Sequence, residues 1–221
     1  MSGDTDKPTK RKRYSPDERR QMIIDASIKF FAEQGFDSST HQLAKHIGVT
    51  QPLIYQYFPS KEDLISAVYA EMFQNRWSDE WDVILADRNR DLRDRLEDFY
   101  TRYCAVIHAP DWIRIFLYSG LKGGDITRRY APIVEERAIR RICIEARDAF
   151  HLPSMDQAPL TNEEFEAAWM MHGGIFYYGV RRYVYGGNVG ATTEQLVQSS
   201  VTLFMDGMSG VARSVGLLAK S

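Results

Sequence analysis

The segment from Ser39 to Leu64 constrains the fold more than any other part of this chain, because local signals divide it into short helices. Ser39 or Thr40 can cap a first helix, and Gln42 is placed to complete a capping box. Gly48 then occupies a sharp turn, where a residue that tolerates positive φ is favoured. These signals predict a short helix that ends in a tight corner.

A second helix follows this corner at once. Thr50 can cap it, and Pro52 stands in its first turn, where a missing N–H costs nothing. Pro59 ends the helix, because the residue before a proline is pushed out of the helical region. The spacing of small Ala44 and apolar Ile54 lets the two helices cross closely. The pattern predicts a helix-turn-helix, whose second helix usually lies in the major groove of DNA.

The residues that carry this pattern are Leu43-Ala44, Gly48-Val49-Thr50, Ile54-Tyr55, Tyr57-Phe58 and Ser60-Lys61-Glu62-Asp63-Leu64. In this order they resemble the TetR family of bacterial one-component regulators. The resemblance is dense from Ser15 to about Val68 and rests on length and helical pattern beyond that point. It implies an all-α fold, with an N-terminal three-helix DNA-binding head and a C-terminal helical ligand-binding and dimerisation body. The alternative is a compact helical trio with no DNA role.

Charge is spread unevenly along the 221 residues, whose formal net charge is −2. Residues 1–61 hold ten lysines and arginines against seven acids, whereas residues 62–221 hold eighteen against twenty-three. A basic head on an acidic body suits a protein that touches DNA at one end. We therefore expect a basic disordered leader at 1–14, a DNA-binding domain at 15–60 and a ligand-binding and dimerisation domain at 61–221. The leader is either a solubilising tail or an arm that contacts phosphates.

Composition and motifs exclude several classes of protein. No stretch approaches the roughly 18 uninterrupted apolar residues that a membrane span needs, and the polar, basic N-terminus lacks the apolar region of a secretory signal. Cys104 and Cys143 have no metal-ligand spacing and are expected to be buried in a reducing cytoplasm. We find no phosphate-binding glycine loop, zinc-helix histidine pair or nucleophile elbow. We expect a cytoplasmic protein that is not an enzyme, needs no cofactor or metal, and binds no membrane.

Helical signals continue along nearly the whole chain. Ser15 and Glu18 form a capping box for a helix that ends at Gly35. Ser60 caps a helix that we expect to run to about Ser78. Further helices are expected at 91–108, 111–121, 127–150, 161–185 and 192–215, and capping boxes open the last two.

Base reading is expected at the start of the recognition helix, where Thr50, Gln51, Pro52 and Leu53 stand. The Gln51 amide can pair with adenine, and Pro52 and Leu53 can contact a thymine methyl group. Two such helices are needed to span successive major grooves of a near-palindromic, double-stranded DNA operator.

Backbone contacts are expected around these residues. The resemblance places Tyr55, Gln56 and Tyr57 at the groove edge and DNA backbone, where the tyrosine hydroxyls could donate to phosphates. It also places Thr40 at a phosphate and His41 within reach of a base. Lys61 begins the next helix, and a helix N-terminus with a lysine attracts phosphate. For Tyr55, packing into the core is the alternative.

The last two predicted helices are expected to form a dimer interface. The first is apolar nearly all round, as in a helix buried from both directions, and the second mixes apolar with small residues that allow close helix approach. In proteins that resemble this family, such a pair meets its copy in a four-helix interface. The alternative is that both helices complete a monomeric core. The candidate interface residues are Phe165, Trp169, His172, Phe176, Leu196, Leu203, Gly207 and Val211.

The body is rich in aromatic residues, and the resemblance implies that a small-molecule inducer binds there. The candidate pocket walls are Tyr103, Phe116, Trp169 and Tyr177, for which an ordinary core role is the alternative. We expect a repressor that a small apolar or aromatic ligand releases from its operator. The alternative is a helix-turn-helix regulator that lacks such a ligand and acts through protein partners or as an activator.

Overall fold

The computed structural model describes residues 14–121 and 125–218. Within these ranges the chain forms helices and no strand, so the predicted all-α class is confirmed. The elements in chain order are α1 (Pro16–Gln34), α2 (Thr40–Ile47), α3 (Gln51–Tyr57), α4 (Lys61–Met72), η1 (Gln74–Arg76), α5 (Asp79–Ala86), α6 (Leu92–Ile107), α7 (Pro110–Leu121), α8 (Asp125–Val134), η2 (Glu135–Arg140), α9 (Arg141–Ala149), α10 (Asn162–Tyr183) and α11 (Thr193–Ser214).

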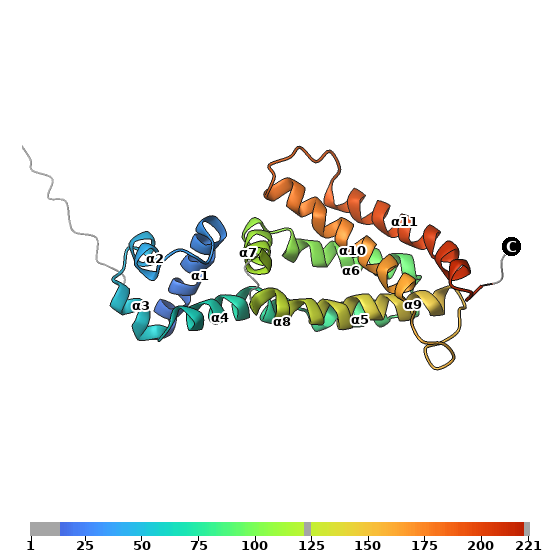
Figure 1. Cartoon of the computed structure of the whole chain (residues 1–221), viewed down its shortest axis with the longest axis horizontal. Helices are drawn as coiled ribbons and strands as arrows, with labels where there is room; N and C mark the ends of the chain where they lie inside the picture. The colour runs from blue at the N-terminus through green and yellow to red at the C-terminus, as the bar shows by residue number, and fades with distance from the viewer. Residues whose placement is uncertain (1–13, 122–124, 219–221) are drawn as a thin grey trace, which may run out of the picture.

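The helices form an elongated molecule with α2 and α3 at one end and the end of α11 at the other (Figure 1). We call α1 to α3 the head and α5 to α11 the body. Helix α4 runs from the head toward the body, and α7 packs against both α1 and α10. Helices α10 and α11 pack side by side along one side of the body. The head therefore touches the body through α7 as well as through α4.

Capping residues set most of the helix starts where the sequence predicts them. Ser15, Ser39, Ser60, Thr161 and Thr192 each cap a helix through a complete capping box. In such a box, side chains satisfy backbone N–H groups that the first turn leaves unpaired. The start of α3 differs from this prediction. Thr50 precedes the helix as expected, but its side chain makes no capping hydrogen bond.

The fourth helix is shorter than predicted. It ends at Met72 rather than near Ser78, because Phe73 leaves the helical conformation and buries its ring against Trp112. The chain then forms η1 and begins a separate helix, α5, whose cap is Ser78: its hydroxyl accepts from the Glu80 N–H. Helix α5 is not among the helices predicted from the sequence.

The helix predicted at 127–150 is present, but it has three parts. Helix α8 continues into the π-helical segment η2 and then into α9, with Pro132 inside α8. A proline lacks the N–H of the helical ladder and disturbs the turn before it. The long helix is therefore continuous in sequence but irregular in its middle.

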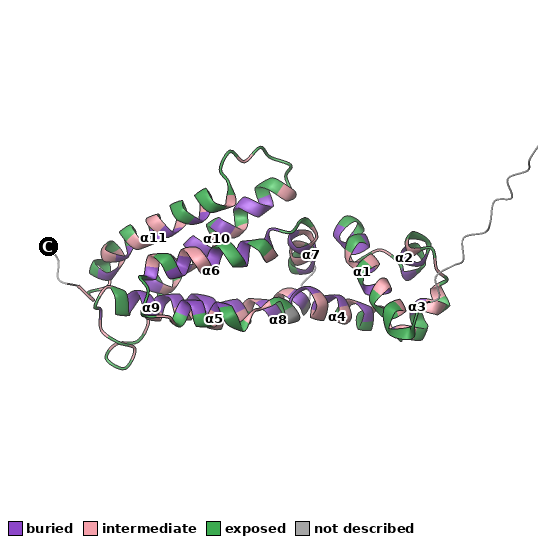
Figure 2. Cartoon of the chain, turned by 180° about the vertical axis from the view of Figure 1, so that it is seen from behind, coloured by how far each residue is buried: buried purple, intermediate pink, exposed green. Residues whose placement is uncertain are grey.

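Buried side chains form one continuous core from the head to the far end of the body (Figure 2). Its densest part is aromatic: Tyr103 stacks on Phe99 at 5.5 Å between ring centroids and meets Trp77 and Trp81 edge to face. Aromatic pairs in these geometries add to the stability that comes from burying their area. This cluster lies where α5 and α6 pack together.

Helix α10 passes very close to α6 and α7 at Gly179. A Cβ at this position would lie 2.5 Å from Ile113 Cδ1 and 2.9 Å from His108 Cδ2, so no larger residue fits without movement. Nearby, His108 donates its Nε2–H to the carbonyl oxygen of Ile175 at 2.9 Å. The glycine thus permits a close crossing that a polar contact then fixes.

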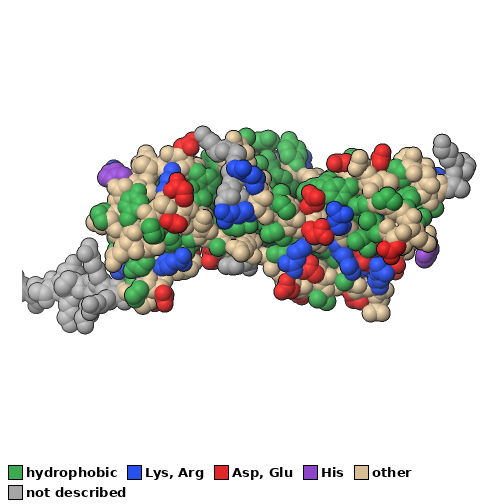
Figure 3. Space-filling model, turned by 60° about the horizontal axis from the view of Figure 1, so that its bottom comes forward, with side chains coloured by type: hydrophobic (Ala, Val, Ile, Leu, Met, Phe, Trp, Pro, Cys, Tyr) green, Lys and Arg blue, Asp and Glu red, His purple; other side chains and the backbone are tan. Residues whose placement is uncertain are grey.

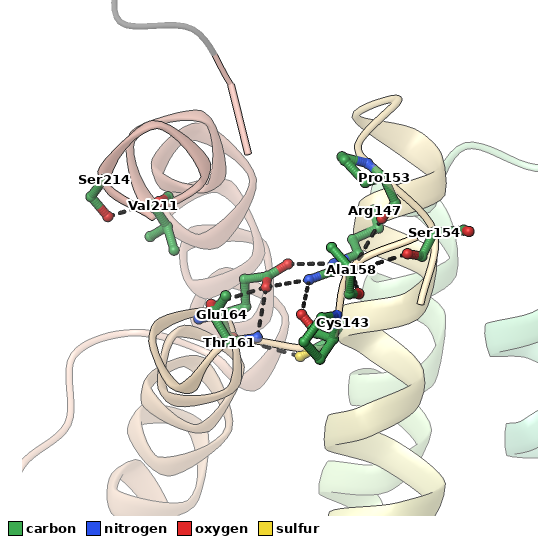
Figure 4. A network of polar contacts seen from close by, with 10 residues as sticks. Cys143, Arg147, Pro153, Ser154, Ala158, Thr161, Glu164, Val211 and Ser214 are labelled. Atoms are coloured by element: carbon green, nitrogen blue, oxygen red, sulfur yellow. Dashed lines mark hydrogen bonds and ion pairs between the residues drawn. The ribbon is translucent and has the colours of Figure 1, made fainter. Parts of the chain in front are cut away.

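Two buried carboxylates form ion pairs that hold together the half of the body farther from the head. Arg147 donates to both carboxylate oxygens of Glu164 and to the carbonyls of Pro153, Ala158 and Pro159 (Figure 4). Burial raises the pKa of Glu164, but the hydrogen bonds from Arg147 and from the chain at residue 161 outweigh it, so that its pKa lies below the ordinary value.

The second carboxylate, Glu145, is wholly buried and pairs with Arg88, Arg95 and Arg141. Burial again raises its pKa, and the hydrogen bonds from the arginines bring it below the ordinary value. On the face of the body that Figure 3 shows, basic and acidic side chains are intermingled.

Candidate nucleic-acid interface

The candidate site begins with the crossing of α2 and α3. Ala44 and Ile54 are buried, 3% and 1% exposed, where the two helices meet. Gly48 adopts the left-handed conformation at φ 77° and ψ 32°, and its N–H donates to the Ala44 carbonyl oxygen at 3.0 Å. The predicted helix-turn-helix corner is therefore present, and it holds α3 at a fixed angle.

One face of α3 points away from the protein. Thr50, Pro52, Tyr55 and Gln56 are exposed, whereas Ile54 is buried in the core of the head. Gln51, Leu53 and Tyr57 are partly exposed at the edges of this face. Because α3 lies at the tip of the molecule (Figure 2), this face is free to approach a large flat or grooved partner.

Three of the candidate residues form a polar network. The Gln51 Nε2–H donates to Thr40 Oγ1 at 2.8 Å, and Thr40 Oγ1 lies 3.0 Å from Tyr55 Oη. Thr40 is 7% exposed, so its hydroxyl is satisfied mainly within the head. Tyr55 is 40% exposed, so its ring is only in part covered by its neighbours.

The remaining candidates flank this network. His41 is exposed at the start of α2, beside Thr40. The Lys61 ammonium group is partly buried and donates to the carbonyl oxygen of Phe36. This bond ties the start of α4 to the chain that follows α1, so that Lys61 also braces the head.

The head itself is not strongly basic. Residues 14–61 hold five lysines and arginines and five acids, so the excess of positive charge in the N-terminal region comes from residues 7–13. The basic leader lies outside the described residues. The described part of the head therefore offers a partner the shape and hydrogen-bonding groups of α3 more than a net charge.

A second surface of interest is an apolar groove of about 350 Å³ between α10 and α11. Met170 and Leu203 are both 76% exposed beside it. The residues that line the groove are Ala167, Met170, Met171, Gly174, Ser200, Leu203, Phe204, Gly207, Met208 and Val211. Of the predicted interface positions, Leu203, Gly207 and Val211 line this groove. Leu196 is partly buried and lies one helical turn before Ser200, the first groove residue on α11.

The predicted interface positions on α10 are packed, wholly or in part, against their own chain. His172 is 7% exposed and lies 3.4 Å from the Tyr100 hydroxyl through its Nδ1 atom, and Phe176 packs edge to face on Phe116. Phe165 and Trp169 are half-buried and pack against the core of the same chain. This face is turned inward because α10 crosses α6 and α7 with it.

The outward face of α10 carries Ala167, Met170 and Gly174, which line the groove and are not among the predicted interface positions. Their spacing of three and four residues marks one face of a helix, and this is the signal that could have found them.

The four predicted pocket walls do not all face one another. Tyr103 is 1% exposed, and its hydroxyl lies 3.1 Å from that of Tyr130. Phe116 stacks on Trp112 at 5.1 Å between ring centroids, within the same interior. Tyr177 is 51% exposed and lies against Tyr185 on the outside of α10, so it is not an interior wall. Trp169 is half-buried and meets His172 edge to face.

Two polar atoms, one just after α6 and one in the first turn of α7, have no hydrogen-bond partner among the described residues. They are Trp112 Nε1 and His108 Nδ1, and both atoms are buried. Burial lowers the pKa of His108, and the hydrogen bond to the Ile175 carbonyl opposes that shift only in part. A buried polar atom without a partner is costly, and each such case needs a physical explanation.

Other site types find no support in the described part of the chain. No helix there is both long and apolar enough to cross a membrane. No group of three or more histidine, cysteine or acidic side chains among the described residues could hold a metal ion. Burial raises the pKa of both Cys104 and Cys143 to about 12, which disfavours the thiolate, the reactive form of cysteine.

Comparison with known proteins identifies the N-terminal region. The sequence profile of bacterial regulatory proteins of the tetR family matches residues 23–68. The HTH-type transcriptional regulator HbdR of Aromatoleum sp. (strain CIB) is 31% identical over 117 residues, which cover 51% of this chain and 49% of that protein. AcrR of Shigella flexneri is 42% identical over 53 residues, covering 24% of this chain and 25% of AcrR. The matched part thus spans about half or less of these curated relatives.

The fold of the whole described chain has relatives of known structure. A TetR-like transcriptional regulator from Rhodococcus sp. RHA1 superposes with a TM-score of 0.69 and 15% identity, covering 90% of this chain and 100% of that one. At this identity the likeness shows a shared fold.

Proposed function

We propose that this chain, a member of the TetR family of bacterial regulatory proteins, is a homodimeric, sequence-specific DNA-binding transcriptional regulator. The observation that carries the proposal is the outward face of α3. The helix is anchored by buried Ile54 and carries exposed Thr50, Pro52 and Tyr55 at the tip of the molecule. A short helix held in this way can enter a major groove, which is about 12 Å wide.

Dimerisation follows from the geometry of DNA reading. One α3 helix reads one half-site, and two half-sites lie about 34–36 Å apart along the duplex. The groove between α10 and α11, with exposed Met170 and Leu203 beside it, offers an apolar surface that a second copy would cover. A two-fold axis along the length of the molecule would bring both heads to the same end of such a dimer, as a near-palindromic operator requires.

A small apolar or aromatic ligand would release this repressor from its operator. The support is the aromatic interior around Phe116, where the buried Trp112 Nε1–H has no hydrogen-bond partner among the described residues. Helix α7 carries Trp112 and also packs on α1, so a ligand that shifts α7 would move the head. Such a ligand would favour a spacing of heads that no longer fits two grooves.

The test is a salt titration of DNA binding by fluorescence anisotropy, with duplexes enriched from genomic fragments. Lys61→Ala and Tyr57→Phe should weaken binding to all sequences about equally, and Lys61→Ala should flatten the salt dependence by about one unit of slope. Lys29→Ala is the matched control, because Lys29 is an exposed lysine on α1, outside the face of α3. If wild type, Lys61→Ala and Tyr57→Phe bind DNA with the same affinity and the same salt dependence, the assignment of this surface to DNA binding is wrong.

The alternative is a regulator without a small-molecule ligand, which acts through protein partners or as an activator. The tight packing of Tyr103 between Phe99 and Trp81 favours it, because a ligand would have to displace these rings. A thermal-shift screen separates the two, since a ligand that binds only the folded state raises the melting temperature by mass action.

A further inference from the structure

We propose that Thr40 and Tyr55 determine which base Gln51 reads, because they fix the direction of its side-chain amide. The inference rests on the proposed DNA-binding function and adds the residues that set its specificity. It concerns three side chains that come from two helices and lie 11 and 15 positions apart in sequence.

The geometry leaves the Gln51 amide little freedom. Its Nε2–H donates to Thr40 Oγ1 at 2.8 Å, and Tyr55 Oη lies 3.0 Å from the same oxygen. The Thr40 side chain is itself fixed in place, because Thr40 is only 7% exposed and is the first residue of α2. A hydroxyl has one hydrogen and two lone pairs, so Thr40 can accept from Gln51 and bond Tyr55 at the same time.

The consequence is a change in what Gln51 can offer to DNA. A free glutamine amide has two N–H donors and one carbonyl acceptor. With one N–H held by Thr40, Gln51 keeps one donor and its acceptor. Adenine presents one donor, N6–H, and one acceptor, N7, in the major groove, and this pair matches what remains.

Guanine is the base that this arrangement disfavours. It presents two acceptors, N7 and O6, in the major groove, and these call for two donors. An amide that has lost one donor to Thr40 cannot supply both. Without the Thr40 hydroxyl the amide could turn and donate twice, so the preference for adenine over guanine should fall.

A simpler role for Thr40 and Tyr55 predicts a different result. If their hydroxyls only contact phosphates, removing either one weakens binding to every sequence by the same factor. The ratio of the affinities for adenine-containing and guanine-containing duplexes therefore distinguishes the two roles, whereas the affinity for a single duplex does not.

The experiment is selection from a pool of double-stranded DNA with a randomised central segment, followed by affinity measurements on matched duplexes. The variants are Thr40→Val, Tyr55→Phe and Gln51→Ala. Thr40→Val removes the hydroxyl and keeps the shape, and Ser39, which caps α2, stays in place. Tyr57→Phe is the matched control, because it removes a hydroxyl from α3 outside the network.

Gln51→Ala should abolish the preference at one base position of each half-site. At that position Thr40→Val should lower the ratio of adenine to guanine affinity by about fivefold or more, the lower end of what a bidentate pair discriminates. Tyr55→Phe should lower it by a smaller factor, and Tyr57→Phe should leave it unchanged. In the Gln51→Ala background, Thr40→Val should change the ratio no further.

A uniform loss of affinity in Thr40→Val, with the wild-type ratio kept, would overturn the inference and leave the proposed function intact. The same holds if Gln51→Ala alters no base preference. A wild-type protein that enriches no sequence from the pool would overturn the proposed function together with the inference.

Discussion

Arg147 on α9 and Glu164 on α10 form a bidentate ion pair in which both hydrogen bonds measure 2.7 Å and both side chains are at most 2% exposed. The same carboxylate accepts from the backbone N–H and the hydroxyl of Thr161, which caps α10. Glu164 therefore completes the capping box of α10 and neutralises the buried Arg147. Arg147 in turn holds the loop at 151–160 through hydrogen bonds to its backbone carbonyls.

Glu164→Gln should destabilise the protein strongly, because it leaves the Arg147 guanidinium buried and uncompensated. Removing one partner of a buried pair costs about 3–5 kcal/mol of unfolding free energy, which urea denaturation followed by circular dichroism can measure. Glu163→Gln is the control, since Glu163 is an exposed acid in the same turn. If the two variants lose similar stability, the pair does not stabilise the body.

Stability should fall between about pH 6.5 and pH 4, and His172 should account for part of the fall. Burial lowers the pKa of His172 to about 4, whereas a histidine in the unfolded chain has a pKa of about 6.5. Within this window the unfolded state binds more protons, so lowering the pH favours unfolding. Below the window, protonation of Glu145 and Glu164, whose pKa values lie below the ordinary value, should continue the loss.

His172→Gln should therefore reduce the slope of unfolding free energy against pH in that window, while His151→Asn, which removes an exposed imidazole, should not. Denaturation midpoints at several pH values measure the slope. A variant with the wild-type slope would show that His172 is not buried as a neutral group.

Leu203→Glu should give monomers, because Leu203 is exposed beside the groove that we propose a second copy covers. A charge buried without a partner in an interface costs several kcal/mol. Light scattering after size-exclusion chromatography reports the mass. Val83→Glu, which changes a 67% exposed residue of α5, is the control and should stay dimeric. A folded, dimeric Leu203→Glu protein would place the interface elsewhere.

The sequence predicts most helix starts because the signals are local. Ser39 and Thr192, for example, cap their helices through residues three positions away. The end of α4 is different, since it depends on Phe73 turning into a core built by distant helices such as α7. A tertiary contact of this kind leaves no local mark, and the short helix α5 after Ser78 was missed with it.

The orientation of α10 could not be predicted for another reason. The helix is apolar nearly all round, so periodicity does not tell which face turns toward α6 and α7. The structure buries His172 and leaves Tyr177 exposed, in part because Gly179 allows one face to approach closely.

In the head, too, one contact could not be predicted from the sequence. Sequence alone predicts a contact between α2 and α3, but not the bond from Gln51 to Thr40, which depends on the angle of the crossing.

A ligand that releases DNA must bind the free dimer more tightly than the DNA-bound dimer, and operator DNA must weaken the ligand by the same factor. Calorimetric titration of a ligand found by thermal shift, with and without operator, measures this coupling. We expect about 5- to 150-fold weaker binding in the presence of DNA. Equal affinity in both titrations would leave the body as a dimerisation scaffold only.

The central claim is that two α3 helices read one operator, and a hydroxyl-radical footprint on an enriched duplex tests it most directly. We expect one dimer to protect two patches that are related by two-fold symmetry and lie about 10–10.5 base pairs apart, or a multiple of that spacing. Gln51→Ala should keep both patches at higher protein concentration while losing the preference for one base. A single patch bound by one chain, or the same sequence preference in wild type and Gln51→Ala, would contradict it.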